Sequence, residues 1–205
     1  MTINSYRAFA TATLLASATA LTSLSAFAGN KNGLDARANE FQMTRPAALS
    51  EGCATKAKGF VRITPVGEAE RMEIFVQGMP ANSEVEVFTI QVPEFPFGMS
   101  WYVGDIKTNA KGKGYASFVS RFNEETFVVA PGEAIATLSH DADAATNPAT
   151  APVHTYHVGI WFDSPEDAIS LGCPGIQTPF NGDHTAGIQV LNTGRFPDTA
   201  GPLLD

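Results

Sequence analysis

The chain has 205 residues, with 13 lysines and arginines against 21 aspartates and glutamates, which gives a formal net charge of −8. Hydrophobic residues make up 44% and charged residues 17%, which is enough apolar material to bury a core and excludes wholesale disorder. The acidic balance argues against a nucleic-acid partner and against docking on an anionic membrane, because both need clustered lysine and arginine. We expect one globular domain, since an all-β chain of this length is usually undivided.

The first 28 residues have the features of an export signal. Arg7 precedes an apolar run diluted by Thr and Ser, which is short and weakly hydrophobic for a bilayer span. Ala26 and Ala28 flank Phe27 and fit the small-x-small rule of signal peptidase. We predict a signal peptide over residues 1–28 and a mature protein in the periplasm or outside the cell, without a membrane span. A retained signal anchor is the alternative.

Two cysteines, Cys53 and Cys173, lie near the two ends of the mature chain. An even cysteine count in an oxidising compartment predicts one disulfide. Closing a loop of roughly 120 residues stabilises a fold by about 4–5 kcal/mol in the chain-entropy model. Two buried free thiols are the alternative, and neither cysteine has the CxxC or CxH spacing of a zinc site.

The mature chain begins with an arm and continues with β-rich runs. Residues 29–56 show no clear periodicity, and we expect an N-terminal arm whose Phe41 and Met43 dock on the domain formed by 57–205. Beyond the arm, short β-rich runs alternate with Gly, Pro and Asn, as in a sandwich. The expected strands, in chain order, cover residues 59–64, 71–77, 83–91, 100–107, 114–122, 125–130, 134–139 and 153–162, and residues 187–192 are a strand-like piece of the C-terminal segment.

Local patterns predict how some of these strands are arranged. Alternation at 71–77 places one side on a core and the other in water, although Phe75 interrupts the polar side. The strands at 100–107 and 114–122 flank an Asn/Gly/Lys turn and are expected to form a hairpin. The strands at 125–130 and 134–139 are expected to form a further pair.

One short helix is expected after the strand at 153–162. Ser164 can cap its first turn, and Pro165 suits the first helical position. Gly172 should end the helix directly before Cys173. Seven or eight mostly antiparallel strands with one short helix near the C-terminal end predict an all-β fold, a single β-sandwich.

The order of several motifs resembles that of uncharacterised secreted bacterial β-sandwich proteins. The motifs are GMPANSEVEVF and PFGMSWYVGDIKTN, then GIWFDSPEDA followed by GC, and TPFNGDHTAGIQVLNT. The resemblance covers most of residues 57–204. It implies secretion and a single domain, and it carries no site residues.

The segment VPEFPFGMSWY, residues 92–102, is the strongest candidate binding element. Its four rings belong to Phe95, Phe97, Trp101 and Tyr102, and two prolines stiffen it. Rigid rings in a loop offer a large contact area for a sugar or a peptide. The alternative is that the loop packs over one end of the core. We expect Phe97 and Tyr102 to be exposed and at least one of Trp101 and Tyr102 to be buried.

Three histidines, His140, His157 and His184, would suit a transition metal if they converged in space. His157 is three residues from His154, and odd spacing in a strand sends the two to opposite faces. His154 falls in line with Ile160 on the expected core face. Histidines with ordinary hydrogen bonds are the alternative.

Catalytic signatures are mostly missing. The sequence lacks a nucleophile elbow, HExxH, a phosphate-binding GxxxxGK[ST] and a GxGxxG after a strand. Glu94, Asp105, Glu124 and Glu125 are available for a glycosidase pair. We expect a secreted, non-catalytic binding or cell-envelope-associated protein with an unknown ligand and no cofactor. The alternatives are an extracytoplasmic hydrolase, such as a carbohydrate-active enzyme, and a metal-binding protein.

Overall fold

The computed structural model describes residues 38–123, 126–129 and 152–203, which all belong to one compact unit. These residues form an all-β structure with one short helix, α1 (Pro165–Ser170). The strands are β1 (Asn39–Met43), β2 (Lys58–Val66), β3 (Ala69–Gln77), β4 (Glu84–Ile90), β5 (Ser100–Lys107), β6 (Lys113–Ser120), β7 (Phe127–Val129), β8 (Pro152–His154), β9 (His157–Phe162) and β10 (Gln189–Asn192).

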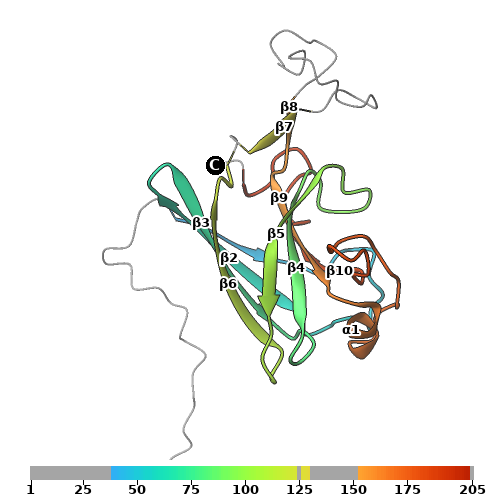
Figure 1. Cartoon of the computed structure of the whole chain (residues 1–205). Coiled ribbons are helices and arrows are strands. Elements are labelled where there is room, and N and C mark those ends of the chain that lie inside the picture. Colours follow the sequence, from blue (N-terminus) through green and yellow to red (C-terminus); the bar gives the residue numbers. More distant parts are fainter. Residues whose placement is uncertain (1–37, 124–125, 130–151, 204–205) are drawn as a thin grey trace, which may run out of the picture. The chain divides into compact units, whose positions relative to one another are not determined.

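Two four-stranded antiparallel sheets make up the sandwich (Figure 1). The first sheet has the order β1-β2-β3-β6, and the second has the order β10-β9-β4-β5. A separate two-stranded sheet pairs β7 with β8. The predicted all-β fold with a short helix near the C-terminal end is confirmed.

Alternate residues of each sheet pack into one shared core. Val61 and Ile74 of the first sheet are fully buried, as are Val87 and Ile160 of the second. Burying one such aliphatic side chain stabilises the fold by about 1.5–3 kcal/mol. The face of a strand that carries apolar residues at every second position therefore turns toward the core. The prediction that the face bearing Ile160 is a core face is confirmed.

The expected hairpin of 100–107 and 114–122 is wrong. A tight turn does link these strands, and the Asn109 N–H donates to the Lys113 carbonyl at 2.9 Å. Beyond one bridge between Thr108 and Gly114, however, β5 pairs with β4 and β6 pairs with β3. The turn therefore carries the chain from one sheet to the other, because β5 pairs with the preceding strand β4 while β6 pairs with the more distant β3.

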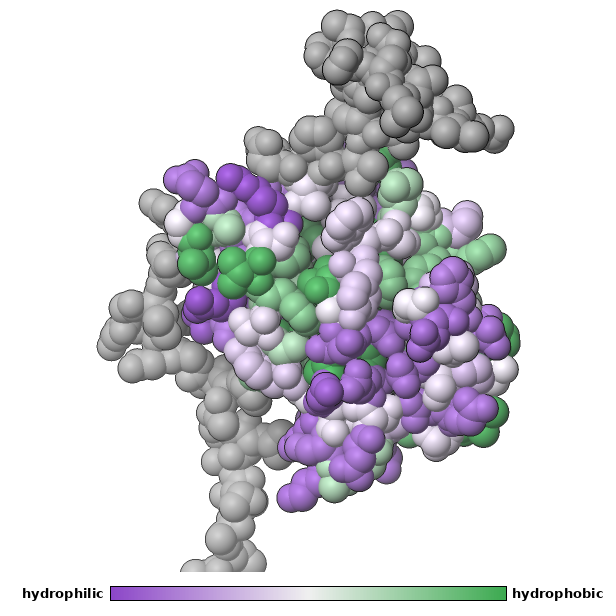
Figure 2. Space-filling view, viewed as in Figure 1, coloured by the Kyte–Doolittle hydropathy of each residue, from purple (hydrophilic) through white to green (hydrophobic). Residues whose placement is uncertain are grey.

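The two sheets are not closed along their edges. Isolated bridges join them at Thr108 with Gly114 and at Thr44 with Asn192. In Figure 2, hydrophobic surface extends from the β2–β3 end across β6 toward β5. Val103 and Phe118 lie partly buried against the core in this edge region.

The N-terminal arm contributes a strand. Residues Asn39–Met43 form β1, which pairs with β2, and Phe41 and Met43 are buried in the core. The expected docking of these two side chains is confirmed, whereas the expectation that the arm lacks a strand is wrong. Five residues with two inward side chains are too short a pattern to stand out in sequence.

The long strand expected at 153–162 is divided. Its beginning, β8, pairs with β7, while its remainder, β9, lies between β4 and β10. His154 is therefore in the small sheet and not in line with Ile160. The expected partner of 125–130, the strand at 134–139, lies outside the described residues.

The helix and the disulfide agree with the predictions. Ser164 Oγ accepts from the Asp167 N–H at 3.2 Å, and Pro165 occupies the first turn. After the helix, Gly172 has a φ of +74°, a left-handed conformation that favours glycine at a helix end. Cys53 and Cys173 form a disulfide. The described part of the chain contains no helix with the length and apolar character needed to cross a membrane.

Candidate functional site

The outer face of the second sheet carries most of the candidate residues. Phe88 and Ile90 of β4 and Trp161 of β9 point away from the main core, yet all three are buried in a second hydrophobic cluster. Phe97 and Phe180, which lie in loops outside the sheet, pack against this cluster. These loops make β9 buried on both faces, so its outward residues are as apolar as its inward ones.

Four aromatic rings form the centre of this outer cluster. Trp161 stacks on Phe180 with ring centroids 4.1 Å apart. Phe97 meets both rings edge-on, at 5.0 Å from Trp161 and 5.3 Å from Phe180. Phe88 also meets both rings edge-on, at 5.3 Å from Trp161 and 5.1 Å from Phe180. Edge-to-face pairs of this kind add about 0.5–1.5 kcal/mol each beyond burial, so the covering loops are firmly held.

The aromatic loop places its first two rings differently from our expectation. Phe97, expected to be exposed, is half-buried in the cluster, while Phe95 is 83% exposed and packs edge-on against Phe97 at 5.9 Å. The loop folds back on itself through bonds from the Val92 N–H to the Phe97 carbonyl and from the Gln91 N–H to the Met99 carbonyl. This return turns Phe97 toward the sheet.

The other two rings of the segment lie on opposite sides of β5. Tyr102 is paired with Phe88 on the outer face, and their ring centroids are 5.6 Å apart. Trp101 is paired with Thr89, which faces the other way. Their exposed fractions are 47% and 66%, so the expectation that one of the two is buried is wrong. Because β5 is an edge strand, neither ring is covered from the side.

The structure therefore brings together Phe95, Phe97 and Tyr102 around the buried cluster and leaves Trp101 apart from them. Phe95 rests on Phe97, Tyr102 rests on Phe88, and the two supporting rings share Trp161 and Phe180 as neighbours. Two exposed rings are thus supported by one rigid base.

Beside Tyr102 lies a hydrogen-bonded pair of carboxyl groups. Glu86 is 4% exposed and is directly opposite Asp105 across the β4–β5 pair. Burial, as the largest cause, and the neighbouring Asp105 and Asp163 together raise the pKa of Glu86 to about 9. At neutral pH the Glu86 carboxyl is therefore protonated and hydrogen-bonded to the Asp105 carboxylate.

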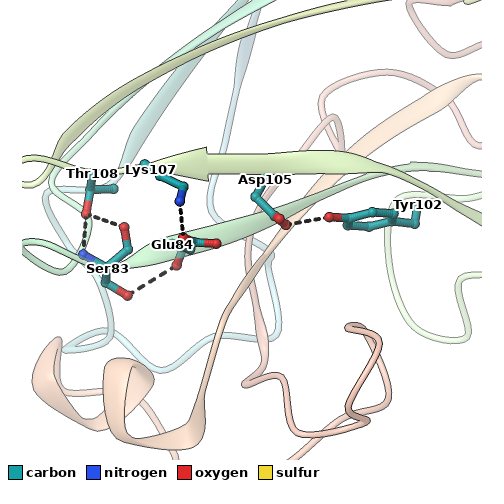
Figure 3. A network of polar contacts seen from close by, with 6 residues as sticks. All are labelled: Ser83, Glu84, Tyr102, Asp105, Lys107 and Thr108. Carbon is teal, nitrogen blue, oxygen red and sulfur yellow. Dashed lines mark hydrogen bonds and ion pairs between the residues drawn. The ribbon is translucent and has the colours of Figure 1, made fainter.

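Tyr102 is tied to the same pair. Its hydroxyl donates to Asp105 Oδ1 at 2.7 Å (Figure 3). Burial and the Asp105 carboxylate raise the pKa of Tyr102, which keeps the phenol protonated. The sequence pointed to Asp105 but missed Glu86, because only the strand register reveals that the two carboxyls meet.

An open depression continues the polar row along β4 and β5. Lys107 Nζ lies 3.0 Å from Glu84 Oε1, and Thr108 Oγ1 accepts from the Ser83 N–H at 3.0 Å (Figure 3). Ser83 also donates to Asp167 of α1, which fixes the helix against this end of the sheet. The depression has a volume of about 510 Å³ and is lined by Asn82, Ser83, Glu84, Lys107, Thr108 and Asp163.

The acids considered for a glycosidase pair do not assemble as such in the described residues. Glu94 accepts from the Ala47 N–H and from the Asn192 side chain, and Glu124 and Glu125 lie outside the described residues. Glycosidase carboxyls are roughly 5–9.5 Å apart to leave room for a sugar or a water molecule. Asp105 is instead directly opposite Glu86 across the β4–β5 pair, where Asp105 and Asp163 both raise the pKa of the buried Glu86 carboxyl.

The histidines considered for a metal site have separate environments. His157 is fully buried, with Nδ1 2.9 Å from Thr193 Oγ1 and Nε2 3.2 Å from the Asp198 carbonyl oxygen, and burial lowers its pKa. His184 is exposed in a loop, and His140 lies outside the described residues. Within 38–123, 126–129 and 152–203, no group of three or more His, Cys, Asp or Glu side chains is placed to hold a metal ion.

Comparison with known proteins adds no assignment to this geometry. No protein-family model, curated protein or solved structure matches the chain. The functional argument therefore depends on the chain's own residues.

Proposed function

We propose that this protein is an exported, non-catalytic β-sandwich that binds a cell-envelope or extracellular ligand through the outer face of its second sheet. Export rests on the signal-like residues 1–28 and is supported by the Cys53–Cys173 disulfide, because such bonds persist in oxidising compartments. The resemblance to secreted bacterial β-sandwich proteins points the same way.

The observation that carries the binding proposal is the pair of exposed rings, Phe95 and Tyr102, on a buried aromatic base. An exposed ring normally loses conformational freedom when a ligand covers it. Here Phe97 and Phe88 already restrict the two rings, so binding incurs less of this entropy cost. Pre-positioned aromatic side chains are typical of recognition surfaces.

The test is a binding screen with the purified protein against envelope polysaccharides and envelope extracts. Phe95→Ala and Tyr102→Ala should each weaken binding by about tenfold, the usual effect of removing a central aromatic contact. Ile176→Ala is the matched control, because Ile176 is an exposed apolar side chain in a different loop. Equal binding by the wild type and both aromatic variants would contradict the proposal.

Phe97→Ala is unsuitable for this experiment because it would open the buried cluster that supports both exposed rings. A loss of binding in that variant would report on stability as well as on contact. The unfolding midpoint of every variant should therefore be measured beside its affinity.

A further inference from the structure

The outer face of the first sheet has a pattern that the proposed function does not use. Antiparallel register places its outward side chains in rows that run across the strands. One row consists of Phe60, Phe75 and Tyr115, on β2, β3 and β6. Gln42 of β1 extends this row at the Phe60 end. Phe75, which interrupts the polar side of β3 in the sequence, is thus the middle of an aromatic band.

The three rings are in contact with one another. Ring centroids are 6.4 Å apart for Phe60 and Phe75 and 4.7 Å apart for Phe75 and Tyr115. Tyr115 is 50% exposed, and Phe60 and Phe75 are half-buried. The Tyr115 hydroxyl donates to Glu73 Oε1 at 2.9 Å, which fixes the orientation of the ring.

A row that contains two lysines borders this aromatic band on one side. The adjacent row is Lys58, Gln77 and Lys113, with both lysines exposed and no carboxylate in the row. The row on the other side is mixed in charge, because Arg62 forms an ion pair with Glu40 at 3.4 Å and Glu73 lies opposite Arg62 on β3. The two lysines, from β2 and β6, thus make one row of this face basic in a chain of net charge −8.

A second open depression lies at the β1 end of the band. Its volume is about 410 Å³, and it is lined by Glu40, Phe41, Gln42, Phe60, Arg195 and Phe196. Because Phe60 and Gln42 belong to both features, the depression continues the aromatic row. Arg195 adds a further cation at this end.

We propose that the outer face of the first sheet binds a carboxylate-bearing polysaccharide, which lies along the aromatic row from Tyr115 to the depression beside Phe60. The apolar faces of the sugar rings contact the aromatic band. The carboxylates of the polymer pair with Lys58 and Lys113, and its hydroxyl groups bond to Gln42 and Gln77. Charge complementarity selects an anionic polymer over a neutral one.

A single-stranded nucleic acid is less well matched to this face. Base stacking needs separate open ring faces, whereas these rings tilt against each other by 43° and 40° and form one continuous band.

The test compares carboxymethyl-dextran with unmodified dextran, two polymers with the same backbone, by isothermal titration at low salt. The wild type should bind the first and not the second. Lys58→Gln with Lys113→Gln should weaken binding by about tenfold, the combined effect of two exposed charge contacts. Tyr115→Ala should weaken it by roughly threefold through lost ring contact.

Arg121→Gln, compared with Lys58→Gln alone, is the charge-matched control, because the Arg121 side chain is exposed and lies outside these rows. This control should bind within about twofold of the wild type, since distant exposed charges are screened by salt. An equal loss in the control would overturn the proposal and indicate general attraction. No binding by the wild type, equal binding of dextran, or tighter binding of an oligothymidylate would also overturn it.

This second site is independent of the first. Phe95→Ala and Tyr102→Ala should leave carboxymethyl-dextran binding unchanged, and Lys58→Gln with Lys113→Gln should leave binding to the second sheet unchanged. Failure of one proposal is therefore distinguishable from failure of the other.

Discussion

Glu86 links protonation to the stability of the second sheet. A glutamate in an unfolded chain has a pKa near 4.5, whereas burial raises the pKa of Glu86 to about 9 in the folded protein. Between these two pH values the unfolded chain has released the proton and the folded protein has kept it. Stability contributed by the protonated carboxyl is therefore fully present at low pH and falls as the pH rises through this window.

Glu86→Gln removes this titration and keeps a side chain of the same shape that can donate to Asp105. The folded wild type holds one proton that its unfolded chain has released, so its free energy of unfolding falls by about 1.4 kcal/mol per pH unit in this window. Both pH 6 and pH 8 lie inside this window. As the pH rises from 6 to 8, the variant should therefore gain about 3 kcal/mol in free energy of unfolding relative to the wild type. In a domain of this size that gain is roughly 6–12 °C in unfolding midpoint.

Thermal unfolding followed by circular dichroism at pH 6, 7 and 8 measures this difference directly. Glu68→Gln is the control, because Glu68 is exposed in the β2–β3 turn and its removal should not change the pH dependence. Parallel pH profiles for the wild type and Glu86→Gln would refute the reasoning and show that Glu86 is ionised in the folded protein.

Three further predictions concern stability. Cys53→Ser should remove about 4–5 kcal/mol, the chain-entropy value for a sequence separation of 120, and reductant should lower the wild-type midpoint to match. Ile160→Ala should cost about 2–5 kcal/mol in denaturant unfolding because Ile160 is fully buried between the sheets, and a loss below about 1 kcal/mol would contradict that placement. Ser164→Ala should cost roughly 1 kcal/mol through the lost bond to the Asp167 N–H, whereas Ser164→Asp should retain most of the stability.

Several features followed from local sequence alone. Ser164, Pro165 and Gly172 mark the ends of α1 because capping and left-handed conformations depend on residues a few positions apart. Alternation in β3 placed Ile74 inside because the side chains of a strand point to opposite faces every second residue. The bond between Cys53 and Cys173 followed from a count of two in a chain that carries an export-like segment.

Tertiary structure decided which strands pair and which outer faces are covered. The turn between β5 and β6 looks like a hairpin in the sequence, yet β5 pairs with the preceding strand β4 and β6 pairs with the more distant β3, so the two strands lie in different sheets. The register between paired strands brings Glu86 against Asp105 and aligns Phe60, Phe75 and Tyr115 in one row. Periodicity tells which side of a strand a residue occupies, but its neighbour on the next strand depends on packing between distant segments.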